Sequence, residues 1–167
     1  AANPERPMSR ILFPTLVSLL MWFLVPPEAE ARVTITRTNY HGWLEAYVMS
    51  NGKASAVIAP AIGRVMQFGF VGEEGVFWEN RALDGRIADG HLMVWAAKDW
   101  ANFGGDKTWP SPESDWSNFT SRKGWRPPPA FDGWSADVRL SGGTLTLVTA
   151  VDPFYGTIAE RRIRLHS

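Results

Sequence analysis

Alternation of apolar and polar residues over short stretches is the feature that most limits the folds open to this chain. This period-two pattern is typical of strands that are buried on one face. Beyond residue 31 the sequence shows no apolar pattern of helical period long enough for a typical helix. The sequence therefore predicts an all-β, antiparallel protein. The predicted strands are residues 32–38, 43–49, 55–59, 64–70, 76–79, 134–140, 144–150 and 157–165.

Two dipeptides indicate how neighbouring strands connect. Asn51-Gly52 and Gly142-Gly143 each stand between two predicted strands. Such pairs favour tight hairpin turns because both residues accept positive φ angles. The sequence therefore predicts antiparallel neighbours at both places.

Regular pattern is nearly absent between residues 80 and 129. The stretch 102–116 is the densest part, with Gly104 and Gly105 followed by prolines and tryptophans. A connection of this length inside a compact domain indicates either a wrong assignment of elements or a functional loop system, and the density of tryptophan, glycine and proline favours the second. Residues 91–97 fit either a short strand or a helical turn. We interpret the region as a stiff, aromatic loop system that receives a ligand.

The N-terminal segment has the pattern of a signal peptide at residues 8–31. Arg10 precedes an apolar run over residues 11–25, and Ala29 and Ala31 form a small-x-small cleavage site. The apolar run is shorter than the roughly 20 residues that span a bilayer. An uncleaved signal anchor is the alternative. We expect no membrane association after cleavage.

The remaining boundaries follow from this interpretation. Residues 1–7 are interpreted as an extension upstream of the natural start at Met8, and residues 32–167 as the mature chain. Its last predicted strand would present an uncovered edge, which complete proteins usually protect. We therefore expect residues 32–167 to be the N-terminal part of a β-sandwich domain.

Charge and composition exclude several classes of partner. Lysine plus arginine and aspartate plus glutamate both number 17, so the formal net charge is zero and no nucleic acid partner is expected. The absence of cysteine excludes disulfides and thiolate metal sites. It suits a periplasmic protein, although secretion to the medium stays open.

Motifs for cofactors and catalysis are missing as well. The sequence has no phosphate-binding glycine loop and no nucleophile elbow. The histidines lie at no metal-binding spacing. We predict neither a cofactor nor a transition-metal site, and the sequence assigns no oligomeric state.

Several short motifs resemble the opening of galactose-mutarotase-like proteins, the superfamily that includes the aldose 1-epimerases. The motifs are Asn51-Gly52, residues 56–60, Gly63-Arg64-Val65-Met66, Phe68-Gly69 and Val76-Phe77-Trp78. The resemblance implies a large antiparallel β-supersandwich with a sugar-facing surface. The epimerases use a histidine acid and a glutamate base. None of His41, His91 and His166 lies in a matching motif, so the resemblance does not extend to the epimerase activity.

Two positions near the sheet are candidates for binding a ligand. Arg64 begins a predicted strand, and its guanidinium has the fork geometry that binds hydroxyls or carboxylates. Alternatively, it caps turn carbonyls or pairs with Glu79. Asn80 and Arg81 follow an aromatic strand, and the resemblance implies a role for them because the epimerases have a similar pair in their sugar site. The alternative is a solvated turn.

The loop region supplies the other candidates. Asp106 and Lys107 follow the two glycines and are predicted to contact the ligand, the alternative being a local salt bridge. Trp109 is predicted to stack on the ligand, since indole rings suit the C–H faces of sugars. The alternative is that most of these rings pack the loops onto the sheet. The loop tryptophans are Trp100, Trp109, Trp116 and Trp125.

Together these observations predict an exported carbohydrate-binding protein with a ligand that is a carbohydrate or similar polyol. Its predicted binding residues are Arg64, Asn80, Arg81, Asp106, Lys107 and Trp109. The alternative is the N-terminal part of a carbohydrate-active enzyme of epimerase or lyase type. No catalytic residue is assigned.

Overall fold

The computed structural model describes residues 32–88, 100–120 and 127–166. The predicted signal peptide, the segment 91–97 and Trp125 lie outside these described residues. Within the described ranges, no helix has the length and apolar character needed to cross a membrane.

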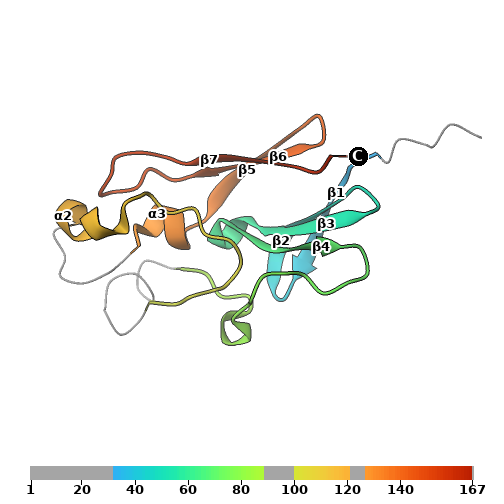
Figure 1. The fold of residues 1–167 in the computed structure, drawn as a ribbon, viewed down its shortest axis with the longest axis horizontal. Helices are drawn as coiled ribbons and strands as arrows, with labels where there is room; N and C mark the ends of the chain where they lie inside the picture. The colour runs from blue at the N-terminus through green and yellow to red at the C-terminus, as the bar shows by residue number, and fades with distance from the viewer. Residues whose placement is uncertain (1–31, 89–99, 121–126, 167) are drawn as a thin grey trace, which may run out of the picture. The chain divides into compact units, whose positions relative to one another are not determined.

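The first sheet is an antiparallel meander in which the strands follow chain order (Figure 1). At its predicted hairpin turn, Gly52 has a φ of +84°. The Asn51 Oδ1 accepts hydrogen bonds from the backbone N–H groups of Lys53 at 2.9 Å and Ala54 at 2.7 Å. The strands are β1 (Thr34–Tyr40), β2 (Trp43–Ser50), β3 (Ala54–Ala59) and β4 (Arg64–Phe70).

The second sheet has three strands, in the order β5-β6-β7. They are β5 (Ala136–Ser141), β6 (Thr144–Thr149) and β7 (Glu160–Arg164), and all pairings are antiparallel. The helices of the described residues are short. They are α2 (Trp116–Thr120) and α3 (Pro129–Asp132), with 3-10 turns η2 (Pro60–Ile62), η3 (Arg81–Leu83) and η4 (Glu113–Asp115). The predicted all-β, antiparallel class is confirmed.

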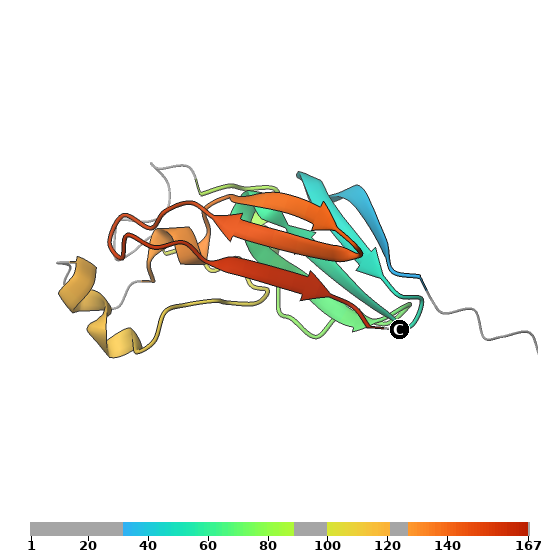
Figure 2. The ribbon, with the colours of Figure 1, turned by 90° about the horizontal axis from the view of Figure 1, so that it is seen from above.

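The two sheets pack against each other as layers, which Figures 1 and 2 show from two sides. The core between them joins side chains of β2 and β3 to side chains of β6 and to Leu165. Burial of each leucine, isoleucine or methionine side chain in this core stabilises the fold by about 1.5–3 kcal/mol. The buried members are Tyr47, Met49, Ala56, Ile58, Leu145, Leu147 and Leu165. The apolar residues of the alternating pattern thus form the core between the two sheets.

A second core cluster lies where β2, η2 and β4 meet the loop region. It contains Trp43, Ala59, Ile62, Met66 and Phe103. Phe103 is only 1% exposed, although it belongs to the stretch predicted to face a ligand. This part of the loop is therefore anchored in the interior.

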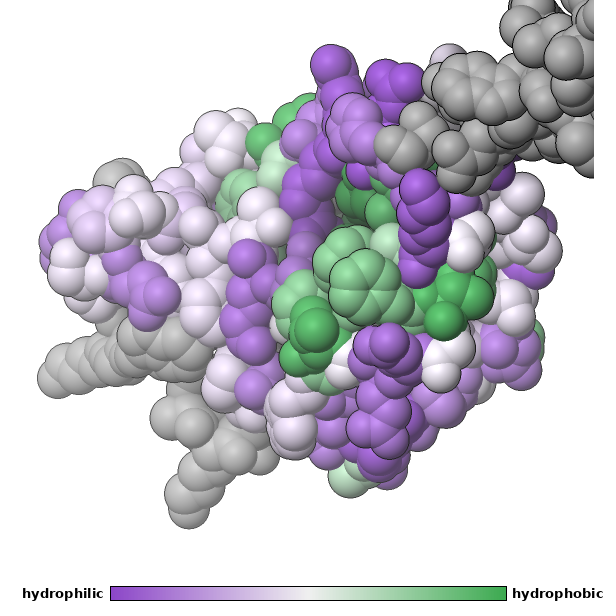
Figure 3. All heavy atoms as spheres, turned by 45° about the vertical axis from the view of Figure 1, so that its right-hand side comes forward, coloured by the Kyte–Doolittle hydropathy of each residue, from purple (hydrophilic) through white to green (hydrophobic). Residues whose placement is uncertain are grey.

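Some large apolar side chains stay on the surface. Figure 3 shows apolar surface gathered on one face and bordered by polar side chains. The exposed large apolar side chains between residues 68 and 78 are Phe68, Phe70, Val71, Val76 and Trp78. The end of β4 and the turn after it therefore carry an unusually apolar surface.

The prediction of a strand at residues 76–79 is wrong. This segment contributes only an isolated bridge between Glu79 and Gly104. Residues 76–79 have two further anchors. The Val76 N–H donates to the Phe68 carbonyl at 2.9 Å, and the Gln67 side chain donates to the Phe77 carbonyl at 2.7 Å and accepts from the Phe77 N–H at 3.2 Å. Side-chain and loop contacts thus replace a strand ladder here.

A bulge in β4 places Gln67 where its side chain can form these hydrogen bonds to Phe77. Gln67 pairs with Val57, whereas Val65 pairs with Ile58, so the register shifts between them. Adjacent residues of a strand point to opposite faces, and paired residues share a face. The bulge therefore directs Val65 to the core between the sheets and Gln67 to the opposite face.

Gly104 is a position at which the fold requires glycine. Its φ is +86°, and a Cβ there would lie 2.1 Å from the Trp78 carbonyl oxygen. The neighbouring Gly105 N–H donates to that same carbonyl at 2.9 Å. Close backbone approach at this point joins the loop to residues 78–80.

We predict that Gly104→Ala destabilises the protein more than Gly72→Ala does. Gly72 has nearly the same φ, +87°, but a Cβ at Gly72 would meet nothing within 4 Å. Both variants carry about 1–2 kcal/mol of left-handed strain, and Gly104→Ala adds roughly 1–3 kcal/mol for the displaced backbone. Urea unfolding of both variants measures the difference. Equal losses would show that the close approach is unimportant.

Candidate functional site

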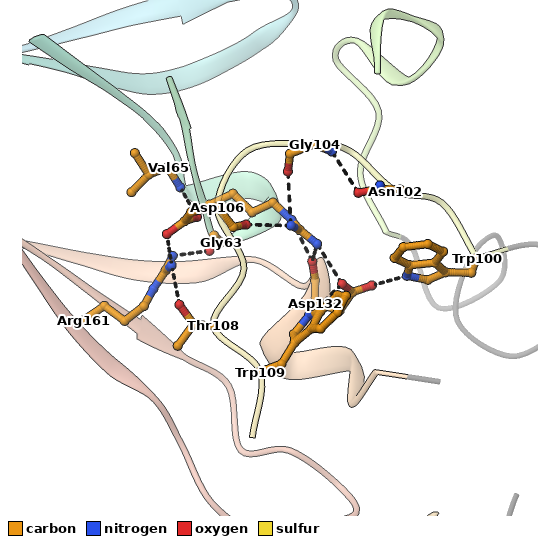
Figure 4. Close-up of polar contacts among 11 residues, drawn as sticks. Gly63, Val65, Trp100, Asn102, Gly104, Asp106, Thr108, Trp109, Asp132 and Arg161 are labelled. Atoms are coloured by element: carbon orange, nitrogen blue, oxygen red, sulfur yellow. Dashed lines mark hydrogen bonds and ion pairs between the residues drawn. The ribbon is translucent and has the colours of Figure 1, made fainter. Parts of the chain in front are cut away.

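Arg64 is an interior residue in which every N–H group is used, and Figure 4 labels the residues that accept from it, Gly104, Asp106 and Asp132. Only 2% of it is exposed. Nε donates to the Asp132 carbonyl at 2.9 Å, and Nη1 donates to the carbonyls of Gly104 at 3.1 Å and Asp106 at 2.7 Å. Nη2 donates to the Asp132 carbonyl and, at 2.7 Å, to Asp132 Oδ1.

This geometry leaves Arg64 no donor for a ligand, because a guanidinium has five N–H groups in all. The alternative interpretation, an arginine that caps carbonyls, describes its position. Its acidic partner is Asp132, at 2.7 Å, and not Glu79. Arg64 is therefore a structural residue and not a ligand contact.

Asp106 is likewise bound within the protein. Its Oδ1 accepts from the Val65 N–H at 2.8 Å, and its Oδ2 pairs with Arg161 Nη1 at 2.7 Å. Arg161 also donates to the Gly63 carbonyl and to Thr108 Oγ1 (Figure 4). Asp106 thus connects the loop to the start of β4 and to β7.

Trp109 packs against other rings and is held at its indole nitrogen. Its Nε1 donates to Asp132 Oδ1 at 3.1 Å, while the indole of Trp100 donates to Oδ2 at 2.8 Å. Trp109 and the buried Trp116 meet edge to face at 5.4 Å. The described loop tryptophans therefore follow the packing alternative.

Asp132 collects these donors in a largely buried place. Burial raises the pKa of its carboxyl group, while Arg64 and the indole N–H groups of Trp100 and Trp109 act in the opposite direction. Lys107 lies nearby with its Nζ 5.6 Å from the centre of the Trp109 ring. Burial, and then the charge of Arg64, lower the pKa of Lys107. Among the described ion pairs, none joins Lys107 to Asp106.

Asn80 and Arg81 begin the short turn η3. The Asn80 Oδ1 accepts from the Ala82 N–H at 3.2 Å, so Asn80 caps the turn. Its backbone N–H donates to the Phe103 carbonyl at 3.0 Å. Arg81, by contrast, keeps 59% of its side chain exposed. Of the two, only Arg81 reaches the hollow described next.

A hollow of about 420 Å³ lies beside residues 74–81. It combines an exposed aromatic ring with carboxylate, guanidinium, phenol and amide groups. The residues that supply these groups are Tyr40, Gln67, Glu74, Trp78, Glu79 and Arg81. Such a mixture of one apolar surface and several convergent polar groups is typical of small-molecule sites.

Glu79 is the central acid of the hollow, with a side chain that is only 4% exposed. The Tyr40 hydroxyl donates to its Oε1. Burial and this hydrogen bond raise the pKa of Tyr40, so the phenol keeps its proton and remains a donor. Arg81 Nη1 lies 3.1 Å from Glu79 Oε2, and His41 Nε2 lies 4.0 Å from it.

Trp78 is one of the residues that line the hollow, and it is 63% exposed. Its backbone is fixed because the Trp78 carbonyl accepts from the Gly105 N–H at 2.9 Å. The loop that the sequence predicts to bind the ligand therefore fixes the backbone of the hollow instead. The rigid backbone leaves the indole ring available to a ligand.

Sequence reasoning missed the most important members of the hollow. Glu79 stands directly before Asn80 and Arg81, so that triplet was the available signal. Tyr40 carried no signal, since it meets Glu79 across 39 positions of sequence. Among the described residues, no group of three or more acidic or histidine side chains is placed to hold a metal ion.

We predict that Arg64→Lys destabilises the protein by about 3–5 kcal/mol. Lysine has three donors where the guanidinium makes five hydrogen bonds, so buried acceptors on the loop and on Asp132 lose hydrogen bonds. The matched control is Arg162→Lys, at an exposed arginine that pairs with Glu160 at 2.7 Å. This control should change stability by less than about 0.5 kcal/mol. Chemical denaturation measures both, and similar effects of the two variants would contradict the structural role of Arg64.

Comparisons of this chain with protein-family models, with curated proteins and with solved structures find no match. The geometry of the hollow is therefore the basis for assigning a function.

Proposed function

We propose that this protein binds a carbohydrate or similar polyol in the hollow beside Trp78 and Glu79. The observation that carries the proposal is a hollow lined by Trp78, which is largely exposed, by the nearly buried Glu79 and by the exposed Arg81. Sugars present a C–H face that stacks on indole and hydroxyls that both donate and accept hydrogen bonds. Trp78, Glu79 and Arg81 supply the complementary groups.

The surroundings support a preformed site. Gln67 holds the backbone of Phe77 through two hydrogen bonds, and Gly105 holds the backbone of Trp78. Tyr40 orients the carboxylate of Glu79. Fixed binding groups lower the entropy that a ligand must overcome.

The proposal includes the family and the location expected from the sequence. A galactose-mutarotase-like supersandwich is in keeping with the two antiparallel sheets and the Asn51-Gly52 hairpin. Export to the periplasm or the medium rests on the signal-peptide pattern at residues 8–31.

Glu79 also favours a second candidate, a carbohydrate-active enzyme of epimerase or lyase type. A carboxylate that lines a hollow and is oriented by a phenol suits proton transfer to or from a bound sugar. Polarimetry on a bound sugar separates the two candidates. Turnover that Glu79→Gln abolishes would favour the enzyme, and binding without turnover would favour the binding protein.

We predict that Trp78→Ala weakens binding of a saccharide by about tenfold or more, because the stacking surface is lost. The matched control is Phe70→Ala, which removes another exposed ring that does not line the hollow. This control should leave the affinity unchanged. Calorimetric titration of the full chain with a panel of neutral mono- and disaccharides provides the measurement. Equal affinities of the two variants would place the ligand elsewhere.

A further inference from the structure

The charges around the hollow are unbalanced towards the acidic side. Glu74 and Glu79 line it together with a single guanidinium, that of Arg81. Arg81 is shared with a further acid, because its Nη1 also lies 3.6 Å from Asp84 Oδ2. A cationic group on a ligand would therefore meet a favourable potential, and an anionic group an unfavourable one.

Glu79 has an oxygen that lacks a hydrogen bond. Oε1 accepts from Tyr40, whereas Oε2 is buried and has no hydrogen-bond donor among the described residues. A buried carboxylate oxygen without a donor is costly, so a donor supplied by a ligand would be strongly favoured.

The neighbouring basic side chains satisfy this oxygen only in part. Arg81 forms an ion pair with Oε2 without the alignment of a hydrogen bond, and its side chain is 59% exposed. His41 lies 4.0 Å from Glu79 Oε2 and 4.0 Å from Asp84 Oδ2, beyond hydrogen-bond distance in both cases.

We infer that the preferred ligand carries a primary ammonium group, as an amino sugar does, and that this group takes the place of the exposed Arg81 side chain at the buried Glu79 Oε2. This inference rests on the proposed function and names the substrate class of the same site. An ammonium supplies three donors and a positive charge, and charge-assisted hydrogen bonds are about twice as strong as neutral ones. The same acidic excess rejects sugars that carry a carboxylate.

The test is calorimetric titration of the full chain with glucosamine, glucose and glucuronate at neutral pH. Glucosamine should bind about tenfold or more tightly than glucose, as expected for one charge-assisted hydrogen bond, and glucuronate should bind most weakly. Glu79→Gln should reduce the ratio of the glucose to the glucosamine dissociation constant to about one. The matched control Glu45→Gln makes the same change at an exposed strand position that does not line the hollow and should keep the ratio.

A third variant separates the roles of the two charges. Arg81→Gln should raise the ratio of the glucose to the glucosamine dissociation constant, because it removes the cation that competes with the ligand for Glu79. A loss of affinity that is the same for both sugars leaves this ratio unchanged. Glucose or glucuronate binding as tightly as glucosamine would overturn the inference and leave the proposed function standing. A ratio that Glu79→Gln leaves intact would also overturn it. Absence of binding by all three sugars would overturn the inference and the proposed function together.

Discussion

The buried guanidinium of Arg64 is the interaction on which the loop region depends. A charge removed from water is tolerated only when partners satisfy it fully. Arg64 meets this condition by donating to carbonyls of Gly104, Asp106 and Asp132 and to the Asp132 carboxylate. These partners come from separate parts of the chain. One side chain thus joins the start of β4, the glycine loop and helix α3.

The glycine loop, Gly104 and Gly105 with their neighbours, connects Arg64 to the residues that line the hollow. Gly104 lies against the backbone of Trp78 and Glu79, at a distance that leaves no room for a Cβ, and Gly105 donates to the Trp78 carbonyl. Because Arg64 holds the loop and the loop holds Trp78, the exposed indole stands on a rigid support. A stretch that looks like a binding loop in sequence therefore serves as a scaffold, and the groups proposed to face the ligand come from the segment beside it.

Arg64 and Arg81 illustrate how two similar residues take different roles. The sequence predicts a ligand contact for both, and both lie within reach of an acid. Arg64 begins β4 and is covered by the glycine loop, so its donors are used internally. Arg81 starts a surface turn and stays exposed at the hollow. The two arginines differ in whether other parts of the chain cover them, and no local pattern of residues reveals this.

The sequence by itself determined the antiparallel all-β class, most of the strands and the hairpin turns, because period-two burial and positive-φ turn residues are local properties. It also indicated that Glu79, Asn80 and Arg81 stand at a boundary of regular structure. Only the tertiary structure decided which polar groups are buried and which are left to bind. Tyr40 meets Glu79, and Asp132 meets Arg64, across 39 and 68 positions. Such pairings depend on how the sheets and loops pack, since desolvation is a property of the whole environment and not of a residue's neighbours in sequence.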